Sequence, residues 1–215
     1  MRIVVNNIAA SSGGAMTVLK DFYSAVCEND KQNEWIFLLG EKYIEETDNI
    51  KVITLPEIKK NPIRKVFFDF FTGKKFIHNL KPDVVFSMQN IITFGLKIPQ
   101  VVYLHQSVPF QSIKNFSFIK NSERKIAFKQ FVVGSIIKSS VKKADKIIVQ
   151  TNWMKEAVCK ICKVNNSKVV NILPTVKNLS QYIDHNSYDS KNFFYPTSGV
   201  LYKNNKLLVD ACKLL

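Results

Sequence analysis

The chain has 215 residues, of which 46% are hydrophobic and 22% are charged. This composition excludes an intrinsically disordered protein and suffices for one core and part of a second. Thirty-one lysines and arginines against 17 acidic residues give a net charge of +14, which favours anionic partners: nucleic acid, phosphorylated metabolites or an acidic membrane surface.

The N-terminal segment MRIVVNNIAASSGGAM does not have the apolar run of a secretory signal, because Asn6 and Asn7 interrupt it. No later segment offers the roughly twenty uncharged apolar residues that cross a bilayer, so we expect a cytoplasmic protein. Cys159 and Cys162 form a C-x-x-C pair, but late in a predicted helix and without a second pair of zinc ligands nearby. We therefore expect reduced, structural thiols and no metal.

Short β-branched segments alternate with helical patterns along most of the chain. The predicted strands span residues 2–5, 35–39, 52–55, 83–87, 100–105, 146–150 and 169–173, and the predicted helices span 15–28, 62–80, 123–142 and 153–163. Several strands are continuously apolar, as strands buried on both faces are. This alternation predicts an α/β fold with a doubly wound, mostly parallel sheet.

The last forty residues differ in character from the rest. Residues 175–191 are polar and aperiodic, which predicts a linker. A strand at 192–195 and an amphipathic helix at 206–215 then resemble the opening of a second βα unit, which alone buries too little surface to fold. The sequence thus predicts a Rossmann-like domain at 1–174, a linker at 175–191 and the truncated start of another domain at 192–215.

Two positions are candidate ligand contacts. Gly13 and Gly14 lie in a loop that enters a helix, where a ligand can approach the backbone and the helix N-terminus stabilises negative charge. A tight turn without a ligand fits this loop equally well. His105 ends a predicted buried strand, at the edge where α/β sheets bind ligands. It can exchange hydrogen bonds with a sugar hydroxyl, or it can simply shape the loop.

The predicted helix at 62–80 combines aromatic and cationic residues. At 100° per residue its core stripe is Ile63, Val66, Phe70 and Ile77, and its opposite face carries Arg64, Phe68, Phe71 and Lys75. Exposed rings among cations are typical of a helix in a lipid headgroup region. Alternatively, the rings pack on a neighbouring loop and the cations are solvated. The basic helix at 123–142 is predicted to cover the sheet with an ordinary solvated outer face.

Seven segments follow one another as MRIVVNN, SSGGAMTVLKDFY, KPDVVFSMQN, PQVVYLHQSVPF, KKADKIIVQTNWMKEAV, VVNILPTV and FFYPTSGVLYKNNKLLVDACKLL. In this order and spacing they resemble the bacterial GT-B glycosyltransferases of family 4, particularly those of capsule and O-antigen gene clusters. The resemblance runs through the whole chain. It implies two Rossmann-like domains that face a cleft, the first receiving the acceptor and the second holding a nucleotide sugar. It also implies transfer with retention, without a metal or a cofactor other than the donor.

The resemblance assigns roles to individual residues. Gly13 and Gly14 resemble the glycine loop that approaches the donor diphosphate, and His105 resembles the histidine that contacts the transferred sugar. Lys203 resembles the cation that meets the donor phosphates.

The chain also departs from the family pattern. The paired glutamates that hold the donor would lie beyond Leu215, and Thr197 and Ser198 stand where an arginine is usual.

These observations together favour the acceptor-side half of a glycosyltransferase. The expected reaction transfers a sugar to a polysaccharide or polyprenyl-linked glycan at the inner face of the cytoplasmic membrane, and we expect this stretch alone to be inactive. Two alternatives stay open: a non-catalytic truncated relative, and a basic nucleic-acid-binding α/β protein, although no recognition motif for nucleic acid is present.

Overall fold

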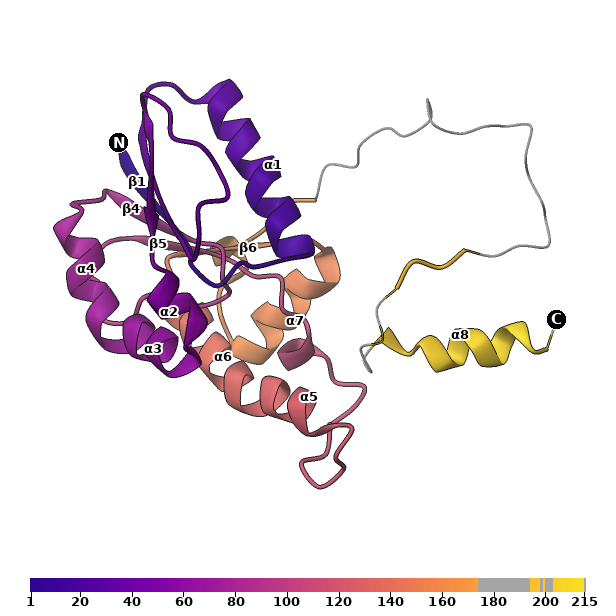
Figure 1. Cartoon of the computed structure of the whole chain (residues 1–215). Coiled ribbons are helices and arrows are strands. Elements are labelled where there is room, and N and C mark those ends of the chain that lie inside the picture. Colours follow the sequence, from indigo (N-terminus) through magenta and orange to yellow (C-terminus); the bar gives the residue numbers. More distant parts are fainter. Residues whose placement is uncertain (174–193, 198, 200–202, 215) are drawn as a thin grey trace, which may run out of the picture.

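The structure is a computed structural model that describes residues 1–173, 194–197, 199 and 203–214. Its described part contains one parallel sheet with strand order β3-β2-β1-β4-β5-β6-β7 (Figure 1). The strands are β1 (Arg2–Asn7), β2 (Glu34–Leu39), β3 (Ile50–Thr54), β4 (Val84–Ser87), β5 (Gln100–Tyr103), β6 (Lys146–Val149) and β7 (Val169–Asn171). The order reverses between β1 and β4, which is the switch point where ligands bind in such sheets.

Helices cover both faces of this sheet (Figure 1). The α-helices are α1 (Gly14–Asn29), α2 (Pro56–Lys60), α3 (Pro62–Phe67), α4 (Gly73–Asn79), α5 (Arg124–Phe128), α6 (Gly134–Lys143), α7 (Asn152–Cys162) and α8 (Asn205–Cys212). Two π-helical turns, η1 (Phe68–Thr72) and η3 (Lys129–Val133), join α3 to α4 and α5 to α6. The short 3₁₀ turns are η2 (Val108–Phe110) and η4 (Asn166–Lys168).

The two faces of the sheet have separate cores. On one face Leu19 of α1 packs with Val5 and Phe37. On the other, residues of η1 and α4 pack over β1, β2 and β4, and residues of α6 and α7 pack over β5, β6 and β7. The right-handed crossovers of parallel strands require this distribution, because the chain winds in opposite directions from β1. The predicted doubly wound α/β fold is therefore confirmed.

The predicted elements agree closely with the observed ones. All seven predicted strands of residues 1–173 are present, with ends that differ by one or two residues. The last predicted helix corresponds to α8. Of the predicted strand at 192–195, Phe194 and Tyr195 are not in a strand, and residues 192 and 193 lie outside the described residues, as does the predicted linker at 175–191.

The helix predicted at 62–80 is confirmed in its extent, since α3, η1 and α4 follow one another without a break, but its predicted faces are wrong. Phe68, expected on the exposed face, is only 3% exposed and belongs to the core, whereas Ile63, expected in the core stripe, is 78% exposed. The cause is η1, in which the backbone N–H of Gly73 donates to the carbonyl of Phe68, five residues earlier. This wider turn puts α3 and α4 out of phase, so a uniform 100° pattern cannot describe both.

Gly73 closes this π-turn and leaves no room for a side chain. A Cβ atom there would lie 2.5 Å from the Phe68 carbonyl oxygen, which cannot move without opening the turn. We expect Gly73→Ala to lower the free energy of unfolding by about 1–3 kcal/mol, despite the better helix propensity of alanine. Chemical denaturation measures this loss. Gly14→Ala is the matched control, because no atom lies within 4 Å of the added Cβ; equal losses in both variants would contradict the steric argument.

Candidate functional site

A hollow of about 520 Å³ lies at the carboxyl edge of the sheet, over the switch point. Its lining residues come from the start of α1, from the ends of β4, β5 and β6, and from the segment before α8: Gly14, Ala15, Val18, Met88, Tyr103, His105, Gln150 and Lys203. Three residues predicted from the sequence, Gly14, His105 and Lys203, thus border one space. Gly13, the residue before Gly14, is the N-cap of α1.

The backbone at Gly13 is suited to an anion. Gly13 has φ 61° and ψ −147°, a combination that is essentially restricted to glycine. Its carbonyl accepts the N–H groups of Met16 at 3.0 Å and Thr17 at 3.2 Å, and no acidic side chain lies in the first turn of α1. The preceding amides of α1 therefore point out of the helix, where its positive end favours phosphate or carboxylate.

His105 is held by Asn90, a residue that sequence reasoning missed. Asn90 follows β4 with φ 67°, a left-handed conformation that asparagine tolerates better than most residues. Its Oδ1 accepts the backbone N–H groups of His105 at 2.8 Å and of Gln106 at 2.9 Å. Its Nδ2 lies 3.1 Å from Nε2 of the His105 ring. One asparagine thus fixes both the loop and the imidazole.

These contacts determine the protonation of His105. Because Asn90 Oδ1 already accepts two backbone N–H groups, its amide presents a donor to Nε2, which must accept. The neutral ring therefore carries its proton on Nδ1. His105 lies at the surface, but the protein atoms around the ring partly desolvate it, and this lowers the pKa of His105 below its ordinary value. At neutral pH His105 is an uncharged hydrogen-bond donor beside the anion-binding end of α1.

Tyr103 and Gln150 complete the floor of the hollow. The Gln150 side-chain amide donates to the Tyr103 hydroxyl, and the Tyr103 ring lies 5.9 Å from the His105 ring. Burial raises the pKa of Tyr103, so its hydroxyl stays protonated and can donate in turn. The polar groups available to a ligand are thus neutral donors at the floor and cationic or amide groups at the rim.

Trp153 extends this site into a trough. A second hollow of about 300 Å³ shares His105 and Gln150 with the first and reaches Trp153 at the start of α7. A third, of about 630 Å³, continues from Trp153 to Lys114. Trp153 lies in the first turn of α7, which the side chain of Thr151 caps, and it is half exposed. A ligand longer than one sugar would follow this trough.

A buried ion pair supports the loop that contains Asn90. Lys65 of α3 contacts Asp69 of η1, and the other carboxylate oxygen of Asp69 accepts Gln89 Nε2 at 3.1 Å. Gln89 precedes Asn90. Burial lowers the pKa of Lys65 and raises that of Asp69, and the two opposite charges counteract both shifts. The outer helix layer is thus connected to His105 by a short series of polar contacts.

Asn6 and Asn7, which end β1, are fully buried. Both side-chain polar atoms of Asn6 and the Nδ2 of Asn7 make no hydrogen bond within the described chain. Buried amides of this kind cost about 1–3 kcal/mol each and are typical of places where function outweighs stability. In the sequence the two asparagines are visible only as an interruption of an apolar segment.

The residues predicted for a membrane surface are not all exposed. Phe71, Arg64 and Lys75 lie at the surface, and Arg64 pairs with Glu57 at 3.2 Å. Phe68 is buried, as described above. No helix in the described part is long and apolar enough to cross a bilayer, and the described residues contain no group of three or more His, Cys, Asp or Glu that could hold a metal ion.

Residues 12–176 match the model of a protein family described as Glycosyltransferase Family 4, and this match covers well over half of the 215 residues. The chain belongs to glycosyltransferase family 4. The resemblance inferred from the sequence motifs is therefore confirmed. No curated protein sequence matches the chain.

Solved glycosyltransferases share the fold of this family 4 member. UGT73P12 of Glycyrrhiza uralensis, complexed with glycyrrhetinic acid 3-O-monoglucuronide, is 9% identical with a TM-score of 0.50, over 80% of this chain and 48% of that one. UGT2 of Phytolacca americana, complexed with UDP-2fluoro-glucose and pterostilbene, is 10% identical with a TM-score of 0.50, over 82% and 53%. The apo form of the lipopolysaccharide outer core galactosyltransferase WaaB is 15% identical with a TM-score of 0.46, over 84% and 47%. The chain thus spans about half the length of these structures.

The protonation of His105 is directly measurable. Nitrogen-15 NMR of the imidazole is expected to show a neutral ring with its proton on Nδ1 at pH 7 and a pKa below 6.5. Asn90→Gly keeps the left-handed backbone but removes the amide, so the tautomer preference should be lost and the pKa should rise. The unfolded chain takes up this proton more readily than the folded chain, so stability should fall as pH drops below about 6.5. An unchanged tautomer in Asn90→Gly would refute the assignment.

Because the Lys65–Asp69 pair is buried, replacing one partner alone should strongly lower the free energy of unfolding. Asp69→Ala leaves the Lys65 charge buried without a partner and should lower the free energy of unfolding by about 3–5 kcal/mol. The double variant Lys65→Met, Asp69→Leu should lose less than the single one. Glu45→Ala breaks the exposed Lys42–Glu45 pair as a control and should cost at most about 1 kcal/mol. Similar losses for Asp69→Ala and Glu45→Ala would be incompatible with a buried pair.

Proposed function

We propose that this chain is the acceptor-side domain of a retaining glycosyltransferase that moves a hexose from a nucleotide sugar to a glycan acceptor in cell-surface polysaccharide biosynthesis. One observation carries the proposal: an anion-binding helix N-terminus and a neutral histidine donor border the same hollow at the switch point of the sheet. Family membership supports it.

In the proposed reaction, the bond from the anomeric carbon to the diphosphate oxygen breaks and a bond to the acceptor hydroxyl oxygen forms. The acceptor proton passes to the leaving diphosphate, which gains negative charge as the bond breaks. The amides of α1 behind Gly13 and the ammonium of Lys203 stabilise that charge. His105 donates from Nδ1 to a hydroxyl of the transferred sugar and holds its ring in place.

The acceptor would enter along the trough that passes Trp153. We propose a glycan linked to a polyprenyl lipid, so that the protein works as a peripheral protein at the inner face of the cytoplasmic membrane. We also propose that residues 1–215 alone transfer no sugar, because the family resemblance places the donor-holding glutamates beyond Leu215.

Nucleotide binding tests the anion site in the chain as it exists. Addition of uridine diphosphate should shift the amide NMR signals of Gly14, Ala15 and His105 more than others. Gly14→Asp brings a carboxylate to the positive end of α1 and should weaken this binding at least about tenfold. Thr72→Asp adds the same charge at an exposed position of η1 and should change nothing. Equal weakening by both variants, or shifts that map elsewhere, would reject the site.

The role of His105 requires a polypeptide that also contains a donor-binding domain. His105→Ala should lower kcat roughly 30- to 1000-fold, which corresponds to about 2–4 kcal/mol of transition-state stabilisation. The thermal transition should be unchanged. A normal kcat would leave His105 with a role in loop structure alone.

A further inference from the structure

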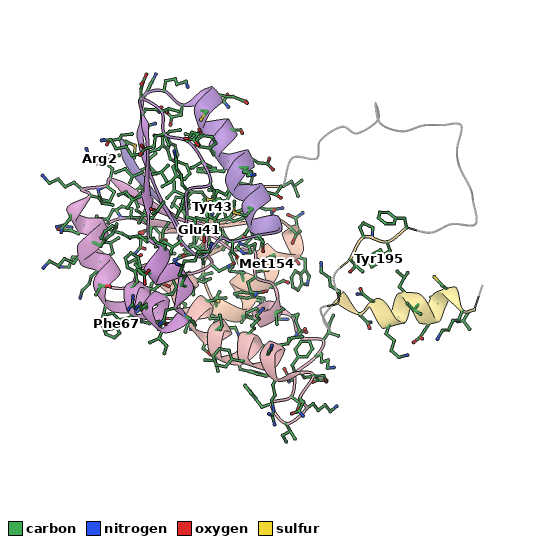
Figure 2. The ribbon with its side chains drawn as sticks, in the orientation of Figure 1. Arg2, Glu41, Tyr43, Phe67, Met154 and Tyr195 are labelled. Carbon is green, nitrogen blue, oxygen red and sulfur yellow. The ribbon has the colours of Figure 1, made fainter. Side chains whose placement is uncertain are left out.

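The outer side of the helix layer that covers β1 to β7 opposite α1 is unusually apolar. On α3 and η1 the exposed rings are Phe67 and Phe71, and on α5 and η3 they are Phe128 and Phe131. Figure 2 shows Phe67 at the outer edge of the ribbon. The outer face of the helix predicted at 123–142 is open to solvent, as expected, but it also carries the exposed apolar residues Phe128, Phe131 and Val132.

Each pair of exposed rings lies in or directly before a π-turn. Each turn buries one polar side chain. In η1 this is Asp69, which accepts a hydrogen bond from Gln89. In η3 it is Gln130, whose amide donates to the carbonyl of Lys114 and accepts from the backbone N–H of Phe116. The extra residue in each turn accommodates this inward polar group. Phe68 and Phe70, which flank Asp69, pack inward, whereas Phe67 and Phe71, two residues away from it, are exposed.

The two sets of rings face the same way. Residues of η1 and α4 pack on the sheet face that includes Val4 and Val85, and α6 packs on the face that includes Val102 and Ile147. The strand registers place these four residues on one face. Phe70 of η1 also packs against the α6 cluster. The outer sides of both helical segments therefore form one broad surface, at the lower side of the ribbon in Figure 1.

An apolar groove runs through the α5 part of this surface. It has a volume of about 550 Å³ and is lined by Phe118, Phe128 and Val133, with Arg124, Lys125 and Lys129 around it. The Phe118 and Phe131 rings lie 5.8 Å apart beside it. Hydrocarbon fits the floor of such a groove and a phosphate fits its rim.

Charge indicates what covers this surface. Between residues 111 and 143 there are eight lysines and arginines and one acidic residue, Glu123, which is buried and pairs with Lys114. A second copy of the chain would bring like charges together. Bases of nucleic acid would need ring faces free for stacking, whereas Phe67 and Phe71 lie against each other at 5.1 Å among aliphatic Ile63 and Val66. An anionic lipid bilayer satisfies both the apolar and the cationic groups.

We propose that this bipartite surface, formed by Phe67 and Phe71 on one segment and by the groove of Phe118 and Phe128 on the other, docks onto anionic lipid bilayers, with lipid chains entering the groove. It deepens the proposed function by defining which face meets the membrane. Lipid binding is measured without sugar transfer, so a failure of this proposal and a failure of the proposed reaction are distinguishable.

Vesicle sedimentation tests the proposal with the intact chain. We expect binding to vesicles of phosphatidylcholine with phosphatidylglycerol, little binding to phosphatidylcholine alone, and marked weakening between about 0.1 and 1 M salt. Lys125→Glu with Lys129→Glu should lower the partition coefficient at least about thirty-fold. Lys20→Glu with Lys31→Glu makes the same change in net charge on exposed residues in and just after α1 and should lower it much less.

The rings are tested separately. Phe128→Ser with Phe131→Ser should lower vesicle binding at least tenfold, as should Phe67→Ser with Phe71→Ser. Val170→Ser with Ile172→Ser, at exposed apolar positions in and just after β7, is the matched control and should have no effect. If a ring variant unfolds, the lysine reversals, which leave the core intact, decide the question.

Three results would overturn the proposal. Equal effects of the patch variants and their controls would show binding by net charge alone. A single-stranded oligonucleotide that binds the chain and loses affinity in the ring variants, while vesicles do not bind, would indicate nucleic acid as the partner. A dimer that is lost in the ring variants, again without vesicle binding, would indicate a second copy.

Discussion

The parallel direction of every strand pair is the constraint on which the rest of the structure depends. Because all strands in the sheet run the same way, the loops that follow β1, β4, β5 and β6 meet at one edge. Residues as far apart in sequence as Gly14, Asn90, His105 and Gln150 are thereby brought to one place. The reversal of strand order between β1 and β4 opens the space between those loops. The site is therefore a consequence of topology before any individual side chain matters.

Within that space a single asparagine determines the chemistry of the histidine. Asn90 uses its oxygen on two backbone N–H groups and its nitrogen on the ring, so the tautomer of His105 follows from the loop conformation. The loop is in turn supported by Gln89 and the buried Asp69. The same π-turn that contributes Asp69 to the interior leaves Phe71 outside. The outer surface and the site are thus parts of one local structure, and a change at either is expected to reach the other through these contacts.

The fold was predictable because its signals are local. Short continuous apolar segments such as the one at β2 are typical of strands buried on both faces, and their alternation with amphipathic segments leaves few topologies. Gly14 and His105 were also accessible from sequence, since Gly14 directly precedes a predicted helix and His105 ends a predicted strand. Trp153, Tyr103 and Gln150 each lie in a predicted helix or strand as well, but nothing in the sequence singles them out from other polar and aromatic residues.

Other features depend on contacts between distant segments and had no sequence signal. The role of Asn90 requires that the loop after β4 meets the end of β5, fifteen residues later. The burial of Phe68 and the exposure of Phe128 occur at π-turns in which Asp69 and Gln130 find partners in other segments. A helical pattern with a fixed 100° step cannot include the extra residue. The prediction that Phe68 faces outward is therefore wrong because the π-turn η1 changes the phase of the helix.

The most direct test of the central claim is a crystal structure of the chain with a nucleoside diphosphate sugar bound. The account predicts diphosphate oxygens about 2.7–3.2 Å from the first amides of α1, with the sugar hydroxyls beside Nδ1 of His105 and Asn90 still bonded to Nε2. A diphosphate bound away from Gly13 and Gly14, or a His105 ring turned so that Nε2 faces the sugar, would contradict it.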